Sequence, residues 1–362
     1  MEGIAALEAG RKSGRHPGAQ LYVSRYGRPV LEFACGDTLA RGPMRTDSLT
    51  SWFSASKPLT AMAIAILIDR DEIRLDDPVC KFLSGFGNGK ERCTIRHVLT
   101  HQGGFANALP NESDLAWDEI VETICAAAAE YEPGTKAGYH PTTGWYILGE
   151  LVRVADGRPI DHFLRAEIFD PLGMAESHMG IGPAEQKSLA GRLARTVNGR
   201  SERPAFASEK FVERWNSEQE IARVNPGGGI RGPARDLGRF YEMLLAGGKV
   251  GERHIVNRGT VDLFTACHRW GLPDLTLANA VLAWGLGFAL HGNADMPLAA
   301  SRRVFGHPGM VSSIGMADPE RRLVCVIITT GFLDPLTNAR RLREVAGAVV
   351  EACGRGGTND HE

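Results

Sequence analysis

Ser54-Ala-Ser-Lys57 is the stretch on which the fold assignment of this chain depends, because of the segments that border it. The apolar pair Trp52-Phe53 precedes it, and the predominantly apolar run 59–67 follows it. Pro58 suits the first turn of a helix, where its missing N–H has no partner to lose. The sequence therefore predicts a buried helix with Ser54 at its N-terminus.

Ser54 and Lys57 are candidates for a nucleophile and its base. Residues three positions apart share one face of a helix, so the Lys57 amine can reach the Ser54 hydroxyl. A serine hydroxyl is a weak nucleophile until a base takes its proton, and a partly desolvated lysine can be that base. The spacing alone fits equally a serine cap followed by a solvent-facing lysine, so its meaning depends on the other motifs.

Length and composition describe an ordinary globular protein. A chain of 362 residues exceeds the size at which a single core usually stops growing, so two lobes are expected. A formal net charge of −2 favours neither nucleic acid nor a membrane surface as a partner. The apolar run 61–68 is too short to span a bilayer, and the first residues lack a signal-peptide pattern. Seven scattered cysteines without a C-x-x-C pair are typical of reduced thiols, so we expect a cytoplasmic location.

Periodicity and turn residues predict the elements of the chain. Short apolar runs at 19–24 and 29–34 surround a glycine turn and predict a β-hairpin. The later segments with helical periodicity are 95–100, 115–131, 142–156, 160–169 and 234–245. The expected strands of an antiparallel meander are 283–290, 302–305, 312–318 and 323–330, and a last helix is expected at 336–353.

This order of elements predicts an α+β fold, an antiparallel sheet flanked by helices with a mostly helical inserted lobe. The hairpin and the nucleophile helix lie at one end of the chain, and the meander and its helix lie at the other. We therefore expect residues 1–75 and 240–362 to form a discontinuous α/β lobe. Residues 76–239 would form the mostly helical lobe.

Two further motifs follow the nucleophile helix. Tyr139 lies in Ala137-Gly-Tyr-His-Pro141, directly before a predicted helix, where a tyrosine can relay a proton to a leaving group. Taken alone, it could equally be an aromatic at the rim. The segment Phe305-Gly-His-Pro-Gly-Met310 opens the meander. A glycine at a strand edge lets a substrate approach the backbone, and the next N–H can donate to an oxyanion.

In this order, the three motifs resemble the serine β-lactamase and penicillin-binding-protein superfamily. The likeness is closest to its class C β-lactamase-like branch, which includes the family VIII carboxylesterases, and it covers roughly residues 15 to 350. Thr94-Ile-Arg-His-Val-Leu-Thr-His-Gln-Gly-Gly is similar to that branch's T-I-R-x-L-L-x-H-T-S-G. Further similar segments are Gly144-Trp-Tyr-Ile-Leu-Gly-Glu-Leu-Val, Phe169-Asp-Pro-Leu-Gly-Met and Pro233-Ala-Arg-Asp-Leu-Gly-Arg-Phe.

The resemblance implies a β-lactamase-like fold and a role for each motif. By this likeness, Ser54 is the acylated nucleophile, Lys57 its activating base and Tyr139 the second acid/base. The backbone amides of Ser54 and Met310 would form the oxyanion hole. His307-Pro308-Gly309 would bind substrate in the place of the lactamases' K-T-G triad. No cofactor or metal is implied.

Two departures from the family pattern bear on the substrate. The usual tyrosine motif is Y-x-N, whose amide holds the acyl-amide carbonyl of a β-lactam or peptide, whereas Pro141 stands there in this chain. His307 replaces the lysine of K-T-G, and histidine is mostly neutral near pH 7. Both changes remove features that recognise β-lactams and leave the acylation groups in place. They favour esters.

Other residues near these motifs are candidates for binding substrate. Phe105, Asn107 and Trp145 are expected to line the cleft, although packing in the core is an equally open interpretation of the two aromatic residues. His97 and His101 have the spacing of the histidines in H-E-x-x-H but lack its glutamate, so we interpret them as packing and loop-anchoring residues.

The sequence therefore predicts a serine carboxylesterase that acts on small-molecule esters through an acyl-enzyme. An acyltransferase or transesterase would use the same residues, and a β-lactamase or D-amino-acid amidase is a further alternative. A catalytically silent binding protein of the same fold is the alternative from a different class. The sequence leaves open the substrate, the acyl acceptor and the oligomeric state.

Overall fold

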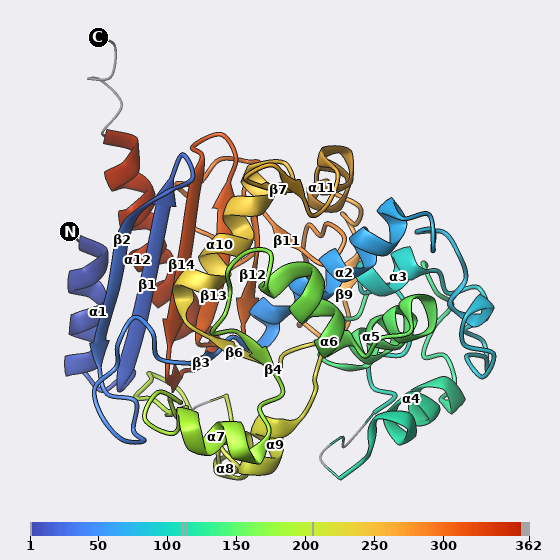
Figure 1. Cartoon of the computed structure of the whole chain (residues 1–362), viewed down its shortest axis with the longest axis horizontal. Coiled ribbons are helices and arrows are strands. Elements are labelled where there is room, and N and C mark those ends of the chain that lie inside the picture. Colours follow the sequence, from blue (N-terminus) through green and yellow to red (C-terminus); the bar gives the residue numbers. More distant parts are fainter. Residues whose placement is uncertain (1, 110–111, 113, 205, 356–362) are drawn as a thin grey trace.

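The computed structural model describes residues 2–109, 112, 114–204 and 206–355, and a six-stranded sheet lies on one side of it (Figure 1). All neighbouring strands of this sheet are antiparallel. In spatial order they are β11 (Ala289–Leu290), β12 (Phe305–Gly309), β13 (Ser313–Asp318), β14 (Leu323–Thr329), β1 (Gly18–Arg25) and β2 (Arg28–Gly36). The pairing of β1 with β14 joins the N-terminal hairpin to the C-terminal meander.

Helices cover both faces of this sheet. They are α1 (Glu2–Lys12) and α12 (Pro335–Arg355) on one face and α10 (Ala234–Leu245) on the other (Figure 1). Alternate residues of a strand point to opposite faces, so Leu21 packs with α1 and α12 whereas Tyr22 packs with α10. Gly238 allows this close approach, because a Cβ there would lie 2.3 Å from the Tyr22 ring.

A buried helix links the sheet to the helical part of the molecule. This helix, α2 (Lys57–Asp69), is buried from Lys57 to Leu67, which matches its unbroken apolar sequence. The helices around it are α3 (Ile95–Leu99), α4 (Trp117–Ala126), α5 (Thr143–Asp156), α6 (Ile160–Leu164) and α11 (Arg258–Thr265). A π-helical turn, η3 (Arg165–Phe169), continues α6. Within the described residues, no helix is long and apolar enough to cross a membrane.

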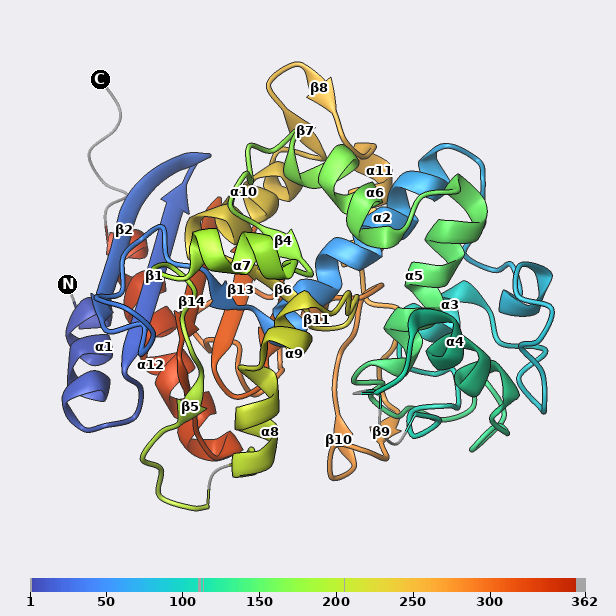
Figure 2. The ribbon, with the colours of Figure 1, turned by 60° about the horizontal axis from the view of Figure 1, so that its bottom comes forward.

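Short elements complete the fold, and Figure 2 shows α8 and α9 close to β5 and α7. The short helices are η1 (Phe53–Ser56), η2 (Val79–Lys81), α7 (Pro183–Leu189), α8 (Glu209–Trp215) and α9 (Glu218–Ala222). The short strands are β3 (Thr50–Ser51), β4 (His178–Met179), β5 (Val197–Asn198), β6 (Ile230–Gly232), β7 (Lys249–Val250), β8 (Arg253–His254), β9 (Pro273–Asp274), β10 (Ala280–Val281) and β15 (Gly331–Phe332).

The antiparallel sheet between helices confirms the predicted fold class, while the predicted strand 283–290 is largely wrong. Only Ala289 and Leu290 pair in the sheet as β11. The preceding residues bond to helical segments instead, since the N–H of Leu286 donates to Phe264 and that of Gly287 donates to Leu99. The predicted helix 115–131 is shorter, and the strand expected at 302–305 begins at its last residue. The division into two lobes stays a prediction.

Candidate active site

Ser54 lies in the short helical turn η1, directly before α2. The preceding residue, Phe53, has a φ of +51°, a conformation that side chains other than glycine rarely adopt. Its ring is held by stacking on Trp215 at 4.6 Å and by contact with Phe332 at 5.1 Å between centroids. The packing around Phe53 therefore holds the backbone that presents Ser54, which is half-buried.

Lys57 is fully buried, and its amine contacts three oxygen atoms. Nζ lies 3.0 Å from Ser54 Oγ, 2.7 Å from the carbonyl oxygen of Pro141 and 2.6 Å from that of Gly227. Burial holds the pKa of Lys57 well below its ordinary value, and the nearby carboxyl of Glu112 opposes this effect only in part. The neutral amine that results has a lone pair for the proton of Ser54.

A glycine-rich turn supplies one of these two carbonyl groups. The N–H of Gly227 donates to Asn225 Oδ1 at 2.9 Å, and the N–H groups of Gly228 and Gly229 donate to the Asn225 carbonyl. A Cβ on Gly227 would lie 2.8 Å from the Pro141 carbonyl oxygen, so a side chain there would crowd the other acceptor of the lysine. Its three consecutive glycines are the signal in the sequence that indicates a close backbone approach.

Tyr139 also contacts Ser54, and its ring centroid lies 5.3 Å from Lys57 Nζ. Its hydroxyl donates to Ser54 Oγ at 2.9 Å. Burial raises the pKa of Tyr139 above its ordinary value, and the bond to Ser54 lowers it only in part. Tyr139 is therefore a protonated acid near neutral pH, while Lys57 is the available base.

A buried ion pair holds the backbone at Tyr139. The N–H of Tyr139 donates to Asp274 Oδ1 at 3.0 Å, and Arg269 donates to Asp274 Oδ2 at 3.1 Å. Both charged side chains are fully buried, and Arg269 also donates to the Thr100 carbonyl. Thr276 Oγ1 donates to the Tyr139 carbonyl at 3.3 Å. Sequence analysis missed Arg269 and Asp274, because no motif or spacing links them to a tyrosine so far away in the chain.

The two histidines with metal-like spacing have the anchoring roles that the sequence suggested. His97 Nδ1 accepts the Thr94 N–H and caps α3. His101 Nδ1 accepts the His140 N–H at 3.0 Å, and its ring lies 4.5 Å from that of Tyr139. Burial holds the pKa of His101 well below its ordinary value, so this ring packs against the site as a neutral group.

His307 is buried at the site as a neutral ring. Its Nδ1 lies 2.6 Å from the Pro308 carbonyl oxygen, so Nδ1 carries the proton and donates. Nε2 is then an acceptor, and it has no partner within the described residues. Burial lowers the pKa of His307 to about 3.

The end of β12 places Met310 beside the nucleophile turn. Gly309 is required there, because a Cβ would lie 2.1 Å from the Trp52 carbonyl oxygen and 2.2 Å from Ser313 Oγ. Met310 follows Gly309 and packs with the cluster around Phe53. In the described part of the chain, neither the Ser54 nor the Met310 N–H donates to a carbonyl outside the regular elements. An oxyanion hole formed by these two N–H groups stays a prediction.

The remaining predicted substrate residues have unequal access to the site. Phe105 and Trp145 are 0% and 1% exposed, which favours core packing, the alternative left open for both. Asn107 is exposed, but its amide donates to Glu130 at 3.0 Å. Pro141 is exposed and contributes its carbonyl to Lys57. Of these four, Pro141 bonds to Lys57 through its carbonyl, and Trp145 contacts the cluster with its ring, whose centroid lies 5.2 Å from Lys57 Nζ.

The protein has an antiparallel sheet flanked by helices, and Ser54 contacts a lysine and a tyrosine at the start of a buried helix. These features define a serine hydrolase of the β-lactamase-like fold. The chain belongs to the beta-lactamase family, whose model matches residues 4–349. This assignment covers the nucleophile turn, the tyrosine loop and β12 together.

Similar proteins include esterases and a penicillin-binding-protein homologue. The esterase/beta-lactamase LipL of Mycobacterium tuberculosis is 28% identical over 359 residues, which cover 93% of this chain and 81% of LipL. The structure of a penicillin-binding-protein homologue from Caulobacter crescentus superposes with a TM-score of 0.81 at 26% identity, over 96% of both chains. A family VIII carboxylesterase has the same fold, with a TM-score of 0.81 at 24% identity and 96% coverage of each chain.

Proposed function

We propose that this protein is a serine carboxylesterase that cleaves small carboxylic esters through an acyl-enzyme on Ser54. The observation that carries the proposal is the position of Ser54 Oγ, which contacts a buried lysine amine at 3.0 Å and a tyrosine hydroxyl at 2.9 Å. The likeness to LipL, whose name includes esterase, supports this class of reaction.

Each group would perform one part of acylation. Lys57 takes the proton of Ser54 as Oγ attacks the ester carbonyl, and the N–H groups of Ser54 and Met310 bind the oxyanion. Tyr139 gives its proton to the leaving alkoxide, which departs as the alcohol. Water then gives a proton to Tyr139 and attacks the acyl group as hydroxide. Ser54 leaves the acyl carbon and recovers its proton from Lys57, which restores the starting state.

The residues at two positions favour esters over β-lactams. Pro141 has no side-chain donor for an acyl-amide carbonyl. His307 is neutral and presents an acceptor at Nε2, so it offers no positive charge to a substrate carboxylate. An ester without a carboxylate near the reacting bond fits such a site better than a β-lactam acid.

The alternatives differ in what they require of the same groups. An acyltransferase would pass the acyl group to an alcohol or amine in place of water, using the same three residues. The name of LipL also includes β-lactamase, which keeps that activity among the reactions to be tested. A silent binding protein would not need Lys57 and Tyr139 both within hydrogen-bonding distance of Ser54. A cytoplasmic location, suggested by seven unpaired cysteines, is part of the proposal.

A panel of p-nitrophenyl esters, measured beside nitrocefin and with or without added alcohols and amines, tests the proposal. We expect rapid hydrolysis of short esters and slow or undetectable hydrolysis of nitrocefin. A fluorophosphonate probe should label the peptide that contains Ser54, and Ser54→Ala should lose both the label and the activity. Labelling of another residue, or nitrocefin hydrolysis as fast as that of the best ester, would overturn the assignment.

A further inference from the structure

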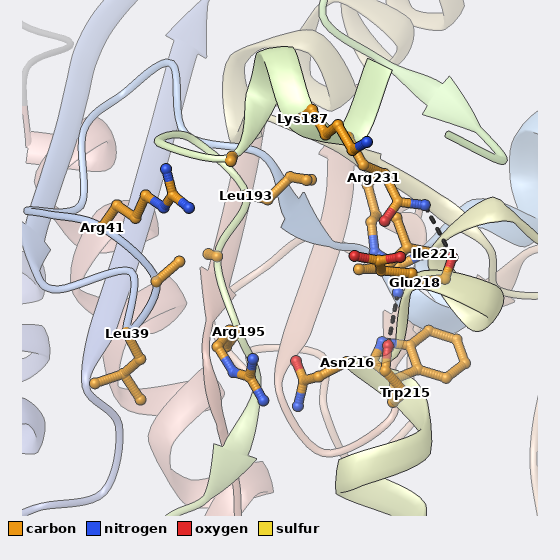
Figure 3. Close-up of a pocket in the computed structure, with 14 residues that line it drawn as sticks. Leu39, Arg41, Lys187, Leu193, Arg195, Trp215, Asn216, Glu218, Ile221 and Arg231 are labelled. Carbon is orange, nitrogen blue, oxygen red and sulfur yellow. Dashed lines mark hydrogen bonds between the residues drawn. The ribbon is translucent and has the colours of Figure 1, made fainter. Parts of the chain in front are cut away.

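A cavity is formed by residues outside the catalytic cluster (Figure 3). It has a volume of about 540 Å³ and is bordered by the loop 39–41, by α7 with the segment after it, by α8–α9 and by β6. This volume is typical of sites for small molecules. Ser54, Lys57 and Tyr139 do not line the cavity, so it is separate from the catalytic cluster.

Positive charge dominates the cavity wall. Arg41, Lys187, Arg195 and Arg231 line it, against the single carboxylate of Glu218. The first three are exposed side chains, and Figure 3 shows Arg41 reaching toward the hollow from its loop, opposite the segment that carries Arg195. An anion in this cavity would therefore be attracted by four cations and repelled by one carboxylate.

Arg231 is a cation that is buried in the cavity wall. It is 4% exposed, and its Nη2 donates to the Trp215 carbonyl at 3.0 Å. Burial lowers the pKa of Arg231 to about 10, with Glu220 partly opposing, so the guanidinium stays charged near neutral pH. Among the described residues, no carboxylate forms an ion pair with it, because Glu220, whose charge acts on it, bonds to Arg223 instead. A buried charge without a carboxylate in contact is costly, and a bound anion would offset that cost.

Apolar residues also line the cavity, and they favour a ligand with an apolar part. They include Leu39, Leu193, Ile221 and Trp215, whereas Gln186 and Asn216 are the neutral polar residues of the wall. We propose that this cavity binds a small organic anion, a carboxylate or phosphate monoester on an apolar body, and that its binding changes the reactivity of Ser54.

The contacts of Trp215 connect this cavity to the nucleophile. Its ring stacks on Phe53, the residue that adopts a positive φ directly before Ser54. Its Nε1 donates to Ser51 Oγ at 3.0 Å, and Ser51 pairs with Arg231 between β3 and β6. A ligand that contacts Arg231 and Trp215 would therefore act on the packing that fixes the Ser54 backbone. The proposed effect of the anion on Ser54 rests on the proposed esterase function, whereas the proposed binding of the anion does not.

Binding is tested by titrating the full chain with phenyl phosphate and with benzoate, using benzamide as the neutral probe and isothermal calorimetry as the readout. We expect saturable binding of at least one anion, and the tighter of the two identifies the charged group. Arg195→Glu should weaken binding about tenfold or more, since it reverses one wall charge. Lys210→Glu is the matched control, because it makes the same charge change on α8 at an exposed position outside the cavity.

The outcomes separate this site from the active site. Binding should persist after Ser54 is blocked by a fluorophosphonate, and the anion should change kcat/KM for an ester in the wild type but not in Arg195→Glu. Loss of binding on blocking Ser54, equal binding of benzamide, or equal weakening by Lys210→Glu would overturn the second site. Binding without a change in kcat/KM would overturn the coupling. Failure of ester hydrolysis would contradict the proposed function but would not affect the evidence for anion binding.

Discussion

At the scale of single residues, the hydrogen-bond acceptors around Lys57 indicate where the protons of its amine point. A neutral amine has two N–H donors and one lone pair, and the carbonyl oxygens of Pro141 and Gly227 are two acceptors at 2.7 and 2.6 Å. With both donors used in this way, the lone pair is left for Ser54 Oγ at 3.0 Å. The geometry therefore favours the same neutral state that burial favours, and it aims the base at the nucleophile.

Replacing Lys57 should abolish most of the activity without unfolding the protein. Lys57→Met removes the base but keeps an apolar chain of similar length, so kcat for a p-nitrophenyl ester should fall by about 10²- to 10⁴-fold. Because the two residues act as a unit, the double variant with Ser54→Ala should be no less active than the worse single variant. A Lys57→Met protein that keeps most of its kcat would identify Tyr139 as the base.

The pH dependence of ester hydrolysis should follow Lys57. As the pH falls through its lowered pKa, the amine gains a proton and can no longer act as a base, so kcat/KM should decrease toward acid. Burial lowers the pKa of His140 to about 4 and that of His307 to about 3, so neither titrates near neutral pH. The raised pKa of Tyr139 keeps the acid protonated into the alkaline range. A pH–rate profile of the folded enzyme without an acid limb would contradict this role of Lys57.

Restoring the β-lactamase residues should shift the substrate preference. Pro141→Asn with His307→Lys adds an amide donor and a positive charge, so nitrocefin turnover should rise relative to ester turnover. The gain should be about 1–3 kcal/mol, the size of a hydrogen bond to a charged partner. Pro141→Ala with His307→Lys is the matched control, because it removes the proline without adding the amide. An equal shift in both variants would show that the amide is not what selects the substrate.

At the scale of elements, the hairpin β9–β10 and the segment before it position the tyrosine loop. Asp274→Asn keeps the shape of the side chain but leaves Arg269 as an unpaired buried charge. Breaking such a pair costs about 3–5 kcal/mol, so Tm should fall. Because Asp274 Oδ1 also accepts the Tyr139 N–H, kcat should fall in the protein that remains folded.

Thr276→Val is the comparison on the same hairpin. It removes a hydroxyl that lies 2.9 Å from Asp274 Oδ1 and 3.3 Å from the Tyr139 carbonyl oxygen, but it keeps the Arg269–Asp274 ion pair, so its effect on both quantities should be smaller. A lower Tm for Asp274→Asn with an unchanged kcat would show that the ion pair stabilises the fold without positioning Tyr139.

The elements also show what sequence patterns predict and what they do not. The hairpin, the later strands of the meander and the helix after Tyr139 were predictable because their periodicity and turn residues are local. The segment 283–288 has the composition of a strand, yet the N–H groups of Leu286 and Gly287 bond to Phe264 and Leu99, which only tertiary structure brings near. For the same reason, Ser54, Lys57 and Tyr139 were recognisable from motifs, whereas Asp274 and Arg269 were not.

At the scale of the whole molecule, the site depends on segments that lie far apart in the chain. Four segments meet there, namely the nucleophile turn, the tyrosine loop, the turn at Gly227 and the end of β12. They meet because β1 pairs with β14 and because α2 passes from the sheet into the helical part. No local pattern specifies the register of residues about 300 positions apart, although the order of elements at the two ends of the chain predicted that these ends share one lobe. The helix α12 stabilises the closure by packing on β14 and α1.

Substitutions in α12 should therefore change the stability of the fold without changing catalysis. Leu342 is fully buried between α12 and the sheet, so Leu342→Ala should lower the free energy of unfolding by about 2–5 kcal/mol. Leu336 on the same helix is 52% exposed, and Leu336→Ala should leave stability nearly unchanged. Neither side chain belongs to the Ser-Lys-Tyr cluster, so kcat/KM per folded molecule should stay close to wild type in both variants. Urea unfolding followed by tryptophan fluorescence, together with ester kinetics, measures the two quantities. A loss of kcat/KM in Leu342→Ala as large as its loss of stability would show that packing behind the sheet controls the position of β12 and its oxyanion-binding N–H.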